Sequence, residues 1–433
     1  MANKTISPGG HLSGVVELPG DKSISHRYAI LSALAEGTSE IRNYSPAADC
    51  ASTLECLGRL GIKIDVNRER VRIAGQGLDG LKPSRRAIDA ENSGSTIRML
   101  SGILAGQPFV SKITGDSSLR RRPMKRVVDP LRQMGAEIQS SDGDRAPLAI
   151  RGGNLHAIDY SLPMPSAQVK SAILFAGLYA DGVTTVRESI RTRDHTEVAL
   201  REFGASLPLA AGEIRIHPRP RLQPRQLVVP GDLSSAVFLI GAALILSESS
   251  LMLHNVGLNP TRARVLDFLI SIGASINLAS VQLRDGELVG DVAVRHSPLA
   301  GGAISGAQVA EMIDELPMLA ALGPFTEQGI EIRDAQELRV KESDRIAALA
   351  AGLREMAASV EEFPDGMRVL GRSAGKLRGA KVNPQGDHRI AMALAVAALG
   401  AAGETVIRDA ECAGVSFPGF FSVLEKLRGA SDL

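Results

Sequence analysis

Aromatic residues, cysteines and long apolar runs are all scarce in this chain of 433 residues. It has 10 Phe, 4 Tyr and no Trp, and its 3 Cys form no CxxC pair. Cysteines in this number and spacing favour reduced thiols over a disulfide framework or a metal cage. The longest apolar runs, residues 236–246 and 390–403, are shorter than the ~18–20 residues of a membrane-spanning helix. The first residues also lack the apolar core of a signal peptide. We therefore expect a cytoplasmic protein that does not enter the membrane.

The charges nearly cancel, with 49 Lys and Arg against 48 Asp and Glu. A protein that binds nucleic acid through counterion release usually has a basic excess, and one that stacks bases has many aromatic residues. A hydrophobic content of 44% excludes a disordered chain. There is no HExxH zinc motif, no GxxxxGK[ST] phosphate loop and no GxSxG elbow. No nucleic acid, membrane, metal or ATP-dependent chemistry is therefore expected.

Two signatures recur six times along the chain. The first is an amphipathic helix that ends on Gly or Ala and continues as a strand, and it occurs at residues 57–64, 131–138, 200–207, 269–276, 353–360 and 424–430. A residue with left-handed backbone at each helix end would let the chain turn into the strand. The second is a polar cluster before an apolar helix of small residues, at residues 20–23, 92–95, 165–168, 231–234, 313–316 and 386–389.

Side chains of Asp, Ser and Asn in these clusters are typical N-caps, and helices that are apolar on all sides are expected to be buried. The repeats predict an α/β protein of six units of ~70 residues, divided into two domains of three units each. Residues 217–224 are rich in proline and are expected to form a connector.

Basic residues accompany the caps. They are Lys22, Arg27, Arg98, Lys170 and Arg389, together with the runs 120–126 and 339–345. Helix N-termini attract anions, so these positions predict a site for an anionic ligand between the domains. The alternatives are caps that only complete helices and charged loops that only face water.

Two acidic positions lie among these cations. Asp314 precedes Glu315 in the fifth cluster, and Glu342 follows Lys341 in the cationic run 339–345. A carboxylate surrounded by cations can act as a base or acid beside an anionic substrate. On spacing alone, an ordinary salt bridge remains the alternative.

Seven segments, in order along almost the whole chain, resemble the 5-enolpyruvylshikimate-3-phosphate synthase (3-phosphoshikimate 1-carboxyvinyltransferase) family. They are Gly20–Arg27, Asn92–Arg98, Arg122–Met124, Ser166–Ser171, Arg193–Glu197, Val340–Arg345 and Asp387–Met392. The resemblance implies a two-domain inside-out α/β barrel of six βαβαββ repeats. Residues 1–19 and 231–433 would form a discontinuous domain, residues 20–230 an inserted domain, and the active site would lie in the cleft between them.

The resemblance also implies the reaction. The enolpyruvyl group of phosphoenolpyruvate would be transferred to the 5-hydroxyl of shikimate 3-phosphate with release of phosphate, by addition and elimination through a tetrahedral intermediate. This step belongs to the shikimate pathway of chorismate and aromatic amino acid biosynthesis, and its enzyme is the target of glyphosate. A cytoplasmic monomer without cofactor or metal is expected.

The matching motifs also imply which residues form the site. For shikimate 3-phosphate the resemblance implies Lys22, Ser23, Arg27, Ser166, Gln168, Thr192, Asp314 and Lys341. For phosphoenolpyruvate it implies Lys22, Gly94, Arg122, Gln168, Arg345 and Arg389. Lys22, Asp314 and Glu342 would be catalytic, with Asp314 as the base for the attacking hydroxyl and Glu342 exchanging protons with the methylene carbon.

Some positions depart from the family pattern. Ala167 replaces a frequent Ser, Glu337 replaces an Asn of some members, and Val415 stands where one branch has a Lys that contacts phosphate. The loss of that Lys leaves open which group protonates the leaving phosphate. Gly94 keeps room for glyphosate, so sensitivity to that inhibitor also stays open.

Two other functions fit parts of the same pattern. UDP-N-acetylglucosamine enolpyruvyl transferases share the fold and the donor, but they carry a loop Cys where this chain has Ser117. A non-catalytic anion-binding protein on the same scaffold would not need both Asp314 and Glu342.

Overall fold

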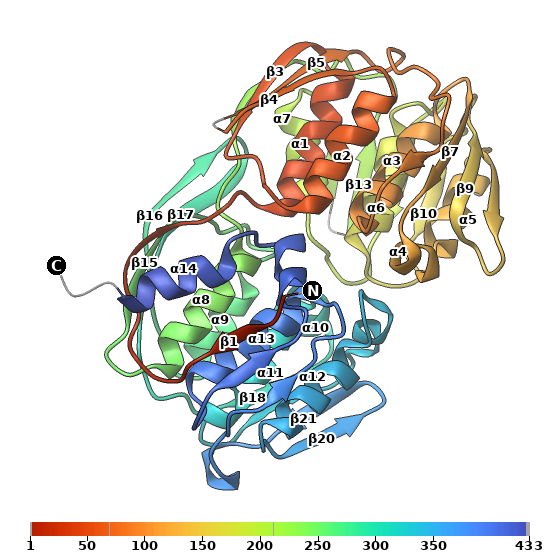
Figure 1. Cartoon of the computed structure of the whole chain (residues 1–433). Helices are drawn as coiled ribbons and strands as arrows, with labels where there is room; N and C mark the ends of the chain where they lie inside the picture. The colour runs from red at the N-terminus through yellow and green to blue at the C-terminus, as the bar shows by residue number, and fades with distance from the viewer. Residues whose placement is uncertain (1, 69, 211, 430–433) are drawn as a thin grey trace. The chain divides into compact units, whose positions relative to one another are not determined.

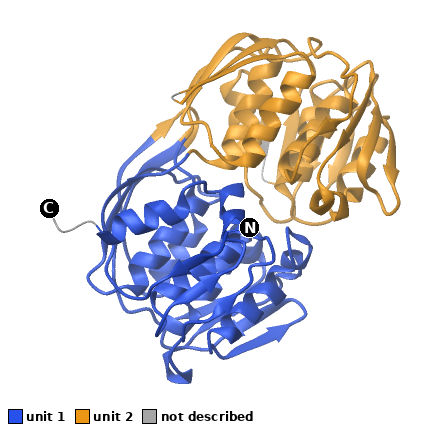
Figure 2. Cartoon of the chain, in the orientation of Figure 1, with its two compact units in different colours: residues 1–19, 230–282, 288–433 blue, residues 20–229, 283–287 orange. Residues whose placement is uncertain are grey.

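The computed structural model describes residues 2–68, 70–210 and 212–429 (Figure 1). Two compact units share the chain, as the colours of Figure 2 show. Unit 1 comprises residues 1–19, 230–282 and 288–433, and unit 2 comprises residues 20–229 and 283–287. Each unit has its own hydrophobic core, built around its buried helices.

Unit 2 contains three sheets with one topology. In each, a first strand pairs parallel with a second, the second pairs antiparallel with a third, and the third pairs antiparallel with a fourth. The first sheet has the order β14 (Gln226–Val228), β3 (Glu36–Arg42), β5 (Arg70–Gln76) and β4 (Lys63–Val66). The second has β6 (Ile88–Asp89), β7 (Val110–Thr114), β9 (Arg145–Arg151) and β8 (Glu137–Ser141). The third has β10 (Asp159–Ser161), β11 (Thr184–Arg187), β13 (Glu213–Ile216) and β12 (Leu209–Ala210).

Unit 1 also contains three sheets. The first has the order β16 (Ser275–Arg284), β17 (Glu287–Arg295), β15 (Ser250–Gly257) and β2 (Ser13–Glu17). The second has the order β18 (Gly302–Ile304), β19 (Ile330–Ile332), β21 (Gly366–Val369) and β20 (Val360–Phe363). The third has three strands, β1 (Lys4–Ile6), β23 (Thr405–Ile407) and β22 (Lys381–Val382). The first strand after the chain start thus completes a sheet whose other strands come from the end of the chain.

Each repeat contributes one buried helix. These are α1 (Lys22–Leu34), α3 (Gly94–Ala105) and α6 (Ala167–Gly177) in unit 2, and α8 (Leu233–Ile245), α11 (Leu316–Leu322) and α13 (His388–Leu399) in unit 1. In unit 2, α3 packs against both α1 and α6, and in unit 1 the three buried helices pack against one another. Helices inside and sheets outside confirm the predicted inside-out α/β fold, in which Ala- and Gly-rich helices fill the core.

The second helix of each repeat is amphipathic and covers the core from outside. These helices are α2 (Ala48–Arg59), α5 (Lys125–Gln133), α7 (His195–Glu202), α9 (Arg264–Ser271), α12 (Arg345–Glu355) and α14 (Phe420–Gly429). Shorter elements are α4 (Ser117–Arg121), α10 (Ala307–Met312), η1 (Gly323–Phe325), η2 (Gln336–Val340), η3 (Arg372–Ala374) and η4 (Ala410–Val415).

The predicted helix ends are confirmed where the chain turns from helix to strand. Gly61, Gly135, Gly204 and Gly273 all have positive φ, between 88° and 103°. Ala357 takes the same left-handed conformation with a φ of 67°. A methyl group disfavours that conformation, so this turn costs more conformational free energy in the fifth repeat than in the four repeats that have glycine there.

Five of the six predicted caps are confirmed. Asp21, Ser93, Ser166, Asp232 and Asp387 each accept a hydrogen bond from a backbone N–H in the first turn of a buried helix. The fifth cluster is different. Glu315 is the N-cap residue of α11 and makes no capping bond, so the carboxylates of this cluster are available for other partners.

The position of the connector was predicted wrongly. Residues 217–225 carry neither helix nor strand, but they belong to unit 2, and Arg219 is bonded through its backbone to Leu178. The chain passes from unit 2 into unit 1 after Val229, and residues 283–287 belong to unit 2 again. Two repeats moreover exchange their first strands. Strand β2 comes just before α1 of unit 2 but pairs with β15 of unit 1, and β14 comes just before α8 of unit 1 but pairs with β3 of unit 2.

Candidate active site

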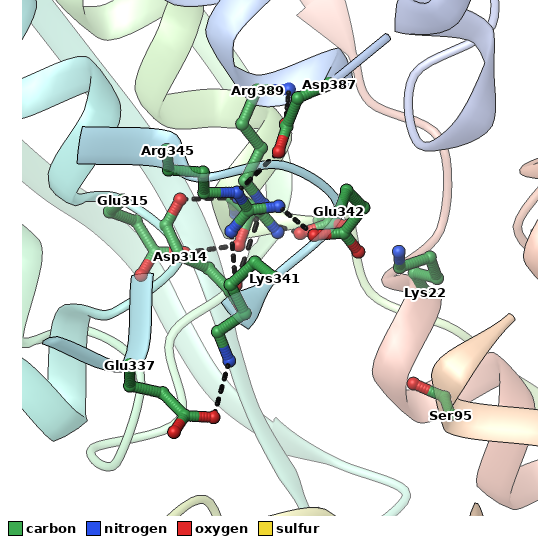
Figure 3. A network of polar contacts seen from close by, with 12 residues as sticks. Lys22, Ser95, Asp314, Glu315, Glu337, Lys341, Glu342, Arg345, Asp387 and Arg389 are labelled. Atoms are coloured by element: carbon green, nitrogen blue, oxygen red, sulfur yellow. Dashed lines mark hydrogen bonds and ion pairs between the residues drawn. The ribbon is translucent and has the colours of Figure 1, made fainter. Parts of the chain in front are cut away.

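Asp314 lies in unit 1 just before α11, and two arginines hold it (Figure 3). Its Oδ1 lies 3.4 Å from Arg345 Nη1 and 3.6 Å from Arg389 Nε, and its carbonyl oxygen accepts a hydrogen bond of 2.7 Å from Arg389 Nη1. Since it caps no helix, its carboxylate faces these cations. Its side chain keeps 20% of its surface exposed, enough for contact with a ligand.

Arg345 is the centre of this cluster. It is the first residue of α12, where Asp344 caps the helix, and it is 2% exposed. Its Nη2 contacts Glu342 Oε2 at 2.6 Å and its Nε contacts Asp387 Oδ2 at 2.8 Å. Burial lowers the pKa of Arg345, but Asp387, Glu342 and Asp314 outweigh that effect and raise it above the ordinary arginine value. Arg345 therefore stays charged.

The acids around Arg345 differ in accessibility. Glu342 keeps 20% of its side-chain surface exposed, whereas Asp387 has 0% and also caps α13. Only Asp314 and Glu342 can reach a ligand. Two accessible carboxylates, on two different nitrogen atoms of one guanidinium, can serve as two separate proton-transfer groups.

Lys341 follows η2 beside this cluster, and its Nζ lies 3.6 Å from Glu337 Oε1. Burial lowers the pKa of Lys341 below that of free lysine, although Asp314 and Glu337 act in the opposite direction. Its ammonium group is thus only partly compensated, and a phosphorylated ligand would stabilise it.

The lowered pKa of Lys341 predicts an alkaline limit for substrate capture. Below that pKa the ammonium is present, and as pH rises through it the positive charge is lost, so kcat/KM for the phosphorylated acceptor should fall. An arginine stays charged over this range, so Lys341→Arg should move the alkaline limb of kcat/KM against pH upward by about one unit or more. Lys376→Arg, at an exposed lysine, is the control. Superimposable limbs for wild type and Lys341→Arg would exclude Lys341 as the titrating group.

The first buried helix of unit 2 carries Lys22, Ser23 and Arg27. Lys22 Nζ lies 2.8 Å from Asp49 Oδ2. Arg27 is 4% exposed and donates to Thr196 Oγ1, Ser171 Oγ and the carbonyl oxygen of Ser23. Burial lowers the pKa of Arg27 to about 10. The three acceptors bonded to it are neutral, and Glu197 and Asp21 compensate its charge only at longer range, so an anionic ligand would add a direct partner for this buried cation.

Gly94, Arg122 and Gln168 lie close together in unit 2. A Cβ atom on Gly94 would lie 3.2 Å from Arg122 Nη1. Arg122 donates to Asn92 Oδ1 at 2.6 Å and is 7% exposed. Gln168 donates through Nε2 to Ser95 Oγ at 2.9 Å. Gly94 and Gln168 thus lie at the N-terminal ends of α3 and α6, and Arg122, which follows α4, lies next to Gly94.

The hydroxyl groups of Ser166 and Thr192 differ in their hydrogen bonds. The hydroxyl oxygen of Ser166 caps α6 by accepting from Val169 N, which leaves its proton for a ligand. Thr192 precedes α7 and is 6% exposed, and its hydroxyl donates to Glu188 Oε1. A hydroxyl carries a single proton, so the predicted contact of Thr192 with a phosphate requires that this proton turn away from Glu188.

Lys170 does not contribute its charge to a ligand site. Its side chain is 0% exposed, and its Nζ lies 2.9 Å from Glu188 Oε2 and 2.7 Å from Glu197 Oε1. We expected the cation of the third cap to face a ligand. This is wrong for Lys170, because its ammonium group is paired with two buried carboxylates.

Reasoning from sequence missed several partners. Asp49, which pairs with Lys22, stands in an ordinary helix and gives no local signal. Asp387 was visible only as a cap, although it also binds Arg345.

Two kinds of feature are absent from the residues that the structure describes. None of the helices there is long and apolar enough to cross a membrane. In the same residues, no group of three or more His, Cys, Asp or Glu side chains could hold a metal ion.

Comparisons with known proteins identify the family. Residues 6–424 match the family described as EPSP synthase (3-phosphoshikimate 1-carboxyvinyltransferase). A 3-phosphoshikimate 1-carboxyvinyltransferase of Solibacter usitatus is 55% identical over 98% of this chain and 99% of its own length. EPSP synthase of Acinetobacter baumannii superposes with a TM-score of 0.87 at 38% identity, over 98% of each chain. NikO, an enolpyruvyl transferase of Streptomyces tendae, shares the fold with a TM-score of 0.79 at 19% identity, over 99% of this chain and 97% of its own. The chain therefore belongs to the EPSP synthase (3-phosphoshikimate 1-carboxyvinyltransferase) family.

Proposed function

We propose that this enzyme transfers the enolpyruvyl group of phosphoenolpyruvate to the 5-hydroxyl of shikimate 3-phosphate and releases phosphate. The observation that carries the proposal is the cluster of Asp314, Glu342 and Arg345, in which two accessible acids share one buried cation. Both substrates are phosphorylated anions, and the candidate residues supply cations at several buried positions.

Asp314 is the base in this proposal. It takes the proton from the attacking hydroxyl as the oxygen adds to the carbon that carries the phosphate. Arg345 and Arg389 contact its carboxylate and hold it in place before the substrate arrives.

Glu342 transfers the second proton, to and from the methylene carbon of phosphoenolpyruvate. Addition of the hydroxyl to phosphoenolpyruvate requires a proton at the methylene carbon, which becomes a methyl group in the tetrahedral intermediate. Elimination of phosphate then removes a proton from that methyl group and restores the double bond. In this step Glu342 starts as the carboxylic acid and gives its proton to the methylene carbon, and its carboxylate takes a proton back from the methyl group during elimination. Glu342 lies 2.6 Å from Arg345 Nη2, so the guanidinium stabilises the carboxylate that exists between these two transfers.

The remaining residues bind the two anions. For shikimate 3-phosphate the proposal assigns Lys22, Ser23, Arg27, Ser166, Gln168, Thr192, Asp314 and Lys341. For phosphoenolpyruvate it assigns Lys22, Gly94, Arg122, Gln168, Arg345 and Arg389. The assigned residues come from both units, so the proposal requires both units to contribute to one substrate complex. Location in the cytoplasm and a monomeric state stay predictions.

The acceptor decides between this function and its nearest rival. The experiment measures phosphate release from phosphoenolpyruvate with shikimate 3-phosphate, with UDP-N-acetylglucosamine, or with no acceptor. We expect release with shikimate 3-phosphate only. If phosphate is released with UDP-N-acetylglucosamine and not with shikimate 3-phosphate, the rival function is correct. If neither acceptor supports phosphate release, the enzyme is not a transferase for these acceptors.

A further inference from the structure

Helices α3 and α6 approach each other more closely than side chains usually permit. A Cβ atom on Gly102 of α3 would lie 2.1 Å from the carbonyl oxygen of Ala172 in α6, so only glycine fits there. One helical turn earlier on each helix, Arg98 and Gln168 therefore face each other across the same contact. The backbone contact at Gly102 and Ala172 sets the distance between these two polar side chains.

The amide of Gln168 is fixed at both ends by α3. Arg98 Nη1 donates to Gln168 Oε1 at 2.6 Å, and Gln168 Nε2 donates to Ser95 Oγ at 2.9 Å. A guanidinium can only donate, so the amide atom that faces Arg98 must be the oxygen. The nitrogen then points the other way. It carries two N–H groups, of which Ser95 takes one within the described part of the chain, and the second is left for a ligand.

Gly94 is constrained by the same arginine. A Cβ atom at this position would lie 2.8 Å from Arg98 Nη1, which is the atom bonded to Gln168. Any side chain at position 94 would thus displace the guanidinium that holds the amide. A methyl group there would act on Gln168 through Arg98, in addition to any space it takes from a ligand.

We infer that Arg98 is a positioning residue, which acts together with Ser95 by holding the amide of Gln168 so that an N–H faces the anionic substrate. Without Arg98 the amide can rotate, and a carbonyl oxygen facing an anion would repel it. Arg98 itself needs no contact with substrate. The inference rests on the proposed function, because it concerns the substrates assigned to Gln168.

A double-mutant cycle tests this inference. Arg98→Met should lower kcat/KM for phosphoenolpyruvate by about 10- to 100-fold, the range of a hydrogen bond to a charged group. In the Gln168→Ala background the same substitution should cost no more than about threefold, since the group through which Arg98 acts is gone. Equal losses in both backgrounds would overturn the inference, because Arg98 would then act on the substrate directly or on the fold.

Ser95→Ala provides a second route if Arg98→Met does not fold. It removes the acceptor at the other end of the amide, and its loss of kcat/KM should likewise disappear in the Gln168→Ala background. Arg59→Met, at an exposed arginine of α2, is the matched control and should leave kcat/KM unchanged. A wild-type enzyme inactive with both substrates would contradict the proposed function. An active wild type with multiplicative losses would contradict only the positioning role of Arg98.

Discussion

Replacement of Asp314 by asparagine is expected to lower kcat by a factor on the order of 10²–10⁴, the contribution of a general base. Asparagine keeps the size of the side chain and an oxygen that can still accept from Arg345 and Arg389, but it cannot take a proton from the acceptor hydroxyl. The affinity for shikimate 3-phosphate should therefore change far less than turnover. Steady-state kinetics with both substrates, together with equilibrium binding of shikimate 3-phosphate, measures the two effects separately.

The matched control for this variant is Asp267→Asn. Asp267 lies in α9 with 67% of its side chain exposed, and it pairs across the surface with Arg264. Its substitution should leave kcat unchanged. If Asp314→Asn keeps turnover within about threefold of wild type, Asp314 is not the base. A parallel loss of binding and turnover would instead mean that its carboxylate organises the arginines.

The largest effect on stability is expected for Arg345→Met. The side chain is 2% exposed and separates three carboxylates, of which Asp387 is 0% exposed. Methionine fills part of the volume but leaves these charges without their shared cation. Loss of one partner from a buried ion pair costs about 3–5 kcal/mol, and we expect the free energy of unfolding to fall by this amount. Urea denaturation followed by circular dichroism measures it.

Two comparisons separate the charge from the volume. Arg368→Met removes an arginine with 47% of its side chain exposed that binds Glu331, and it should cost less than about 1 kcal/mol, as exposed pairs do. Glu342→Gln in the Arg345→Met background should recover part of the lost stability, because it removes one of the repelling carboxylates. If Glu342→Gln destabilises Arg345→Met further, the loss arises from packing and not from uncompensated charge.

The fold could be predicted well from local signals. Glycines at helix ends and polar caps act within one turn of the backbone, so Gly61, Gly135, Asp21 and Ser93 reveal their roles in the sequence itself. The exchange of β2 and β14 has no such signal. The choice of a partner strand depends on the path of the chain between the two units, and no residue in either strand encodes it.

The candidate site could be predicted only in part. The acids and cations stood out because they cluster in the sequence, as Lys341, Glu342 and Arg345 do. The partners that set their charges come from distant segments. Asp49 reaches Lys22 from another helix, and Lys170 is withdrawn from the site by Glu188 and Glu197. Such pairs form when helices pack, so spacing along the chain cannot reveal them.

Uptake of deuterium from the solvent distinguishes addition and elimination from a direct displacement. The reaction of phosphoenolpyruvate with shikimate 3-phosphate is run in D₂O, and the product is analysed for deuterium at its methylene carbon by mass spectrometry. Addition converts that methylene into a methyl group with a solvent deuteron, and elimination then removes one of its hydrogens, so deuterium is expected in the product vinyl group. Product that forms with release of phosphate but carries no deuterium would contradict the tetrahedral intermediate and the role of Glu342.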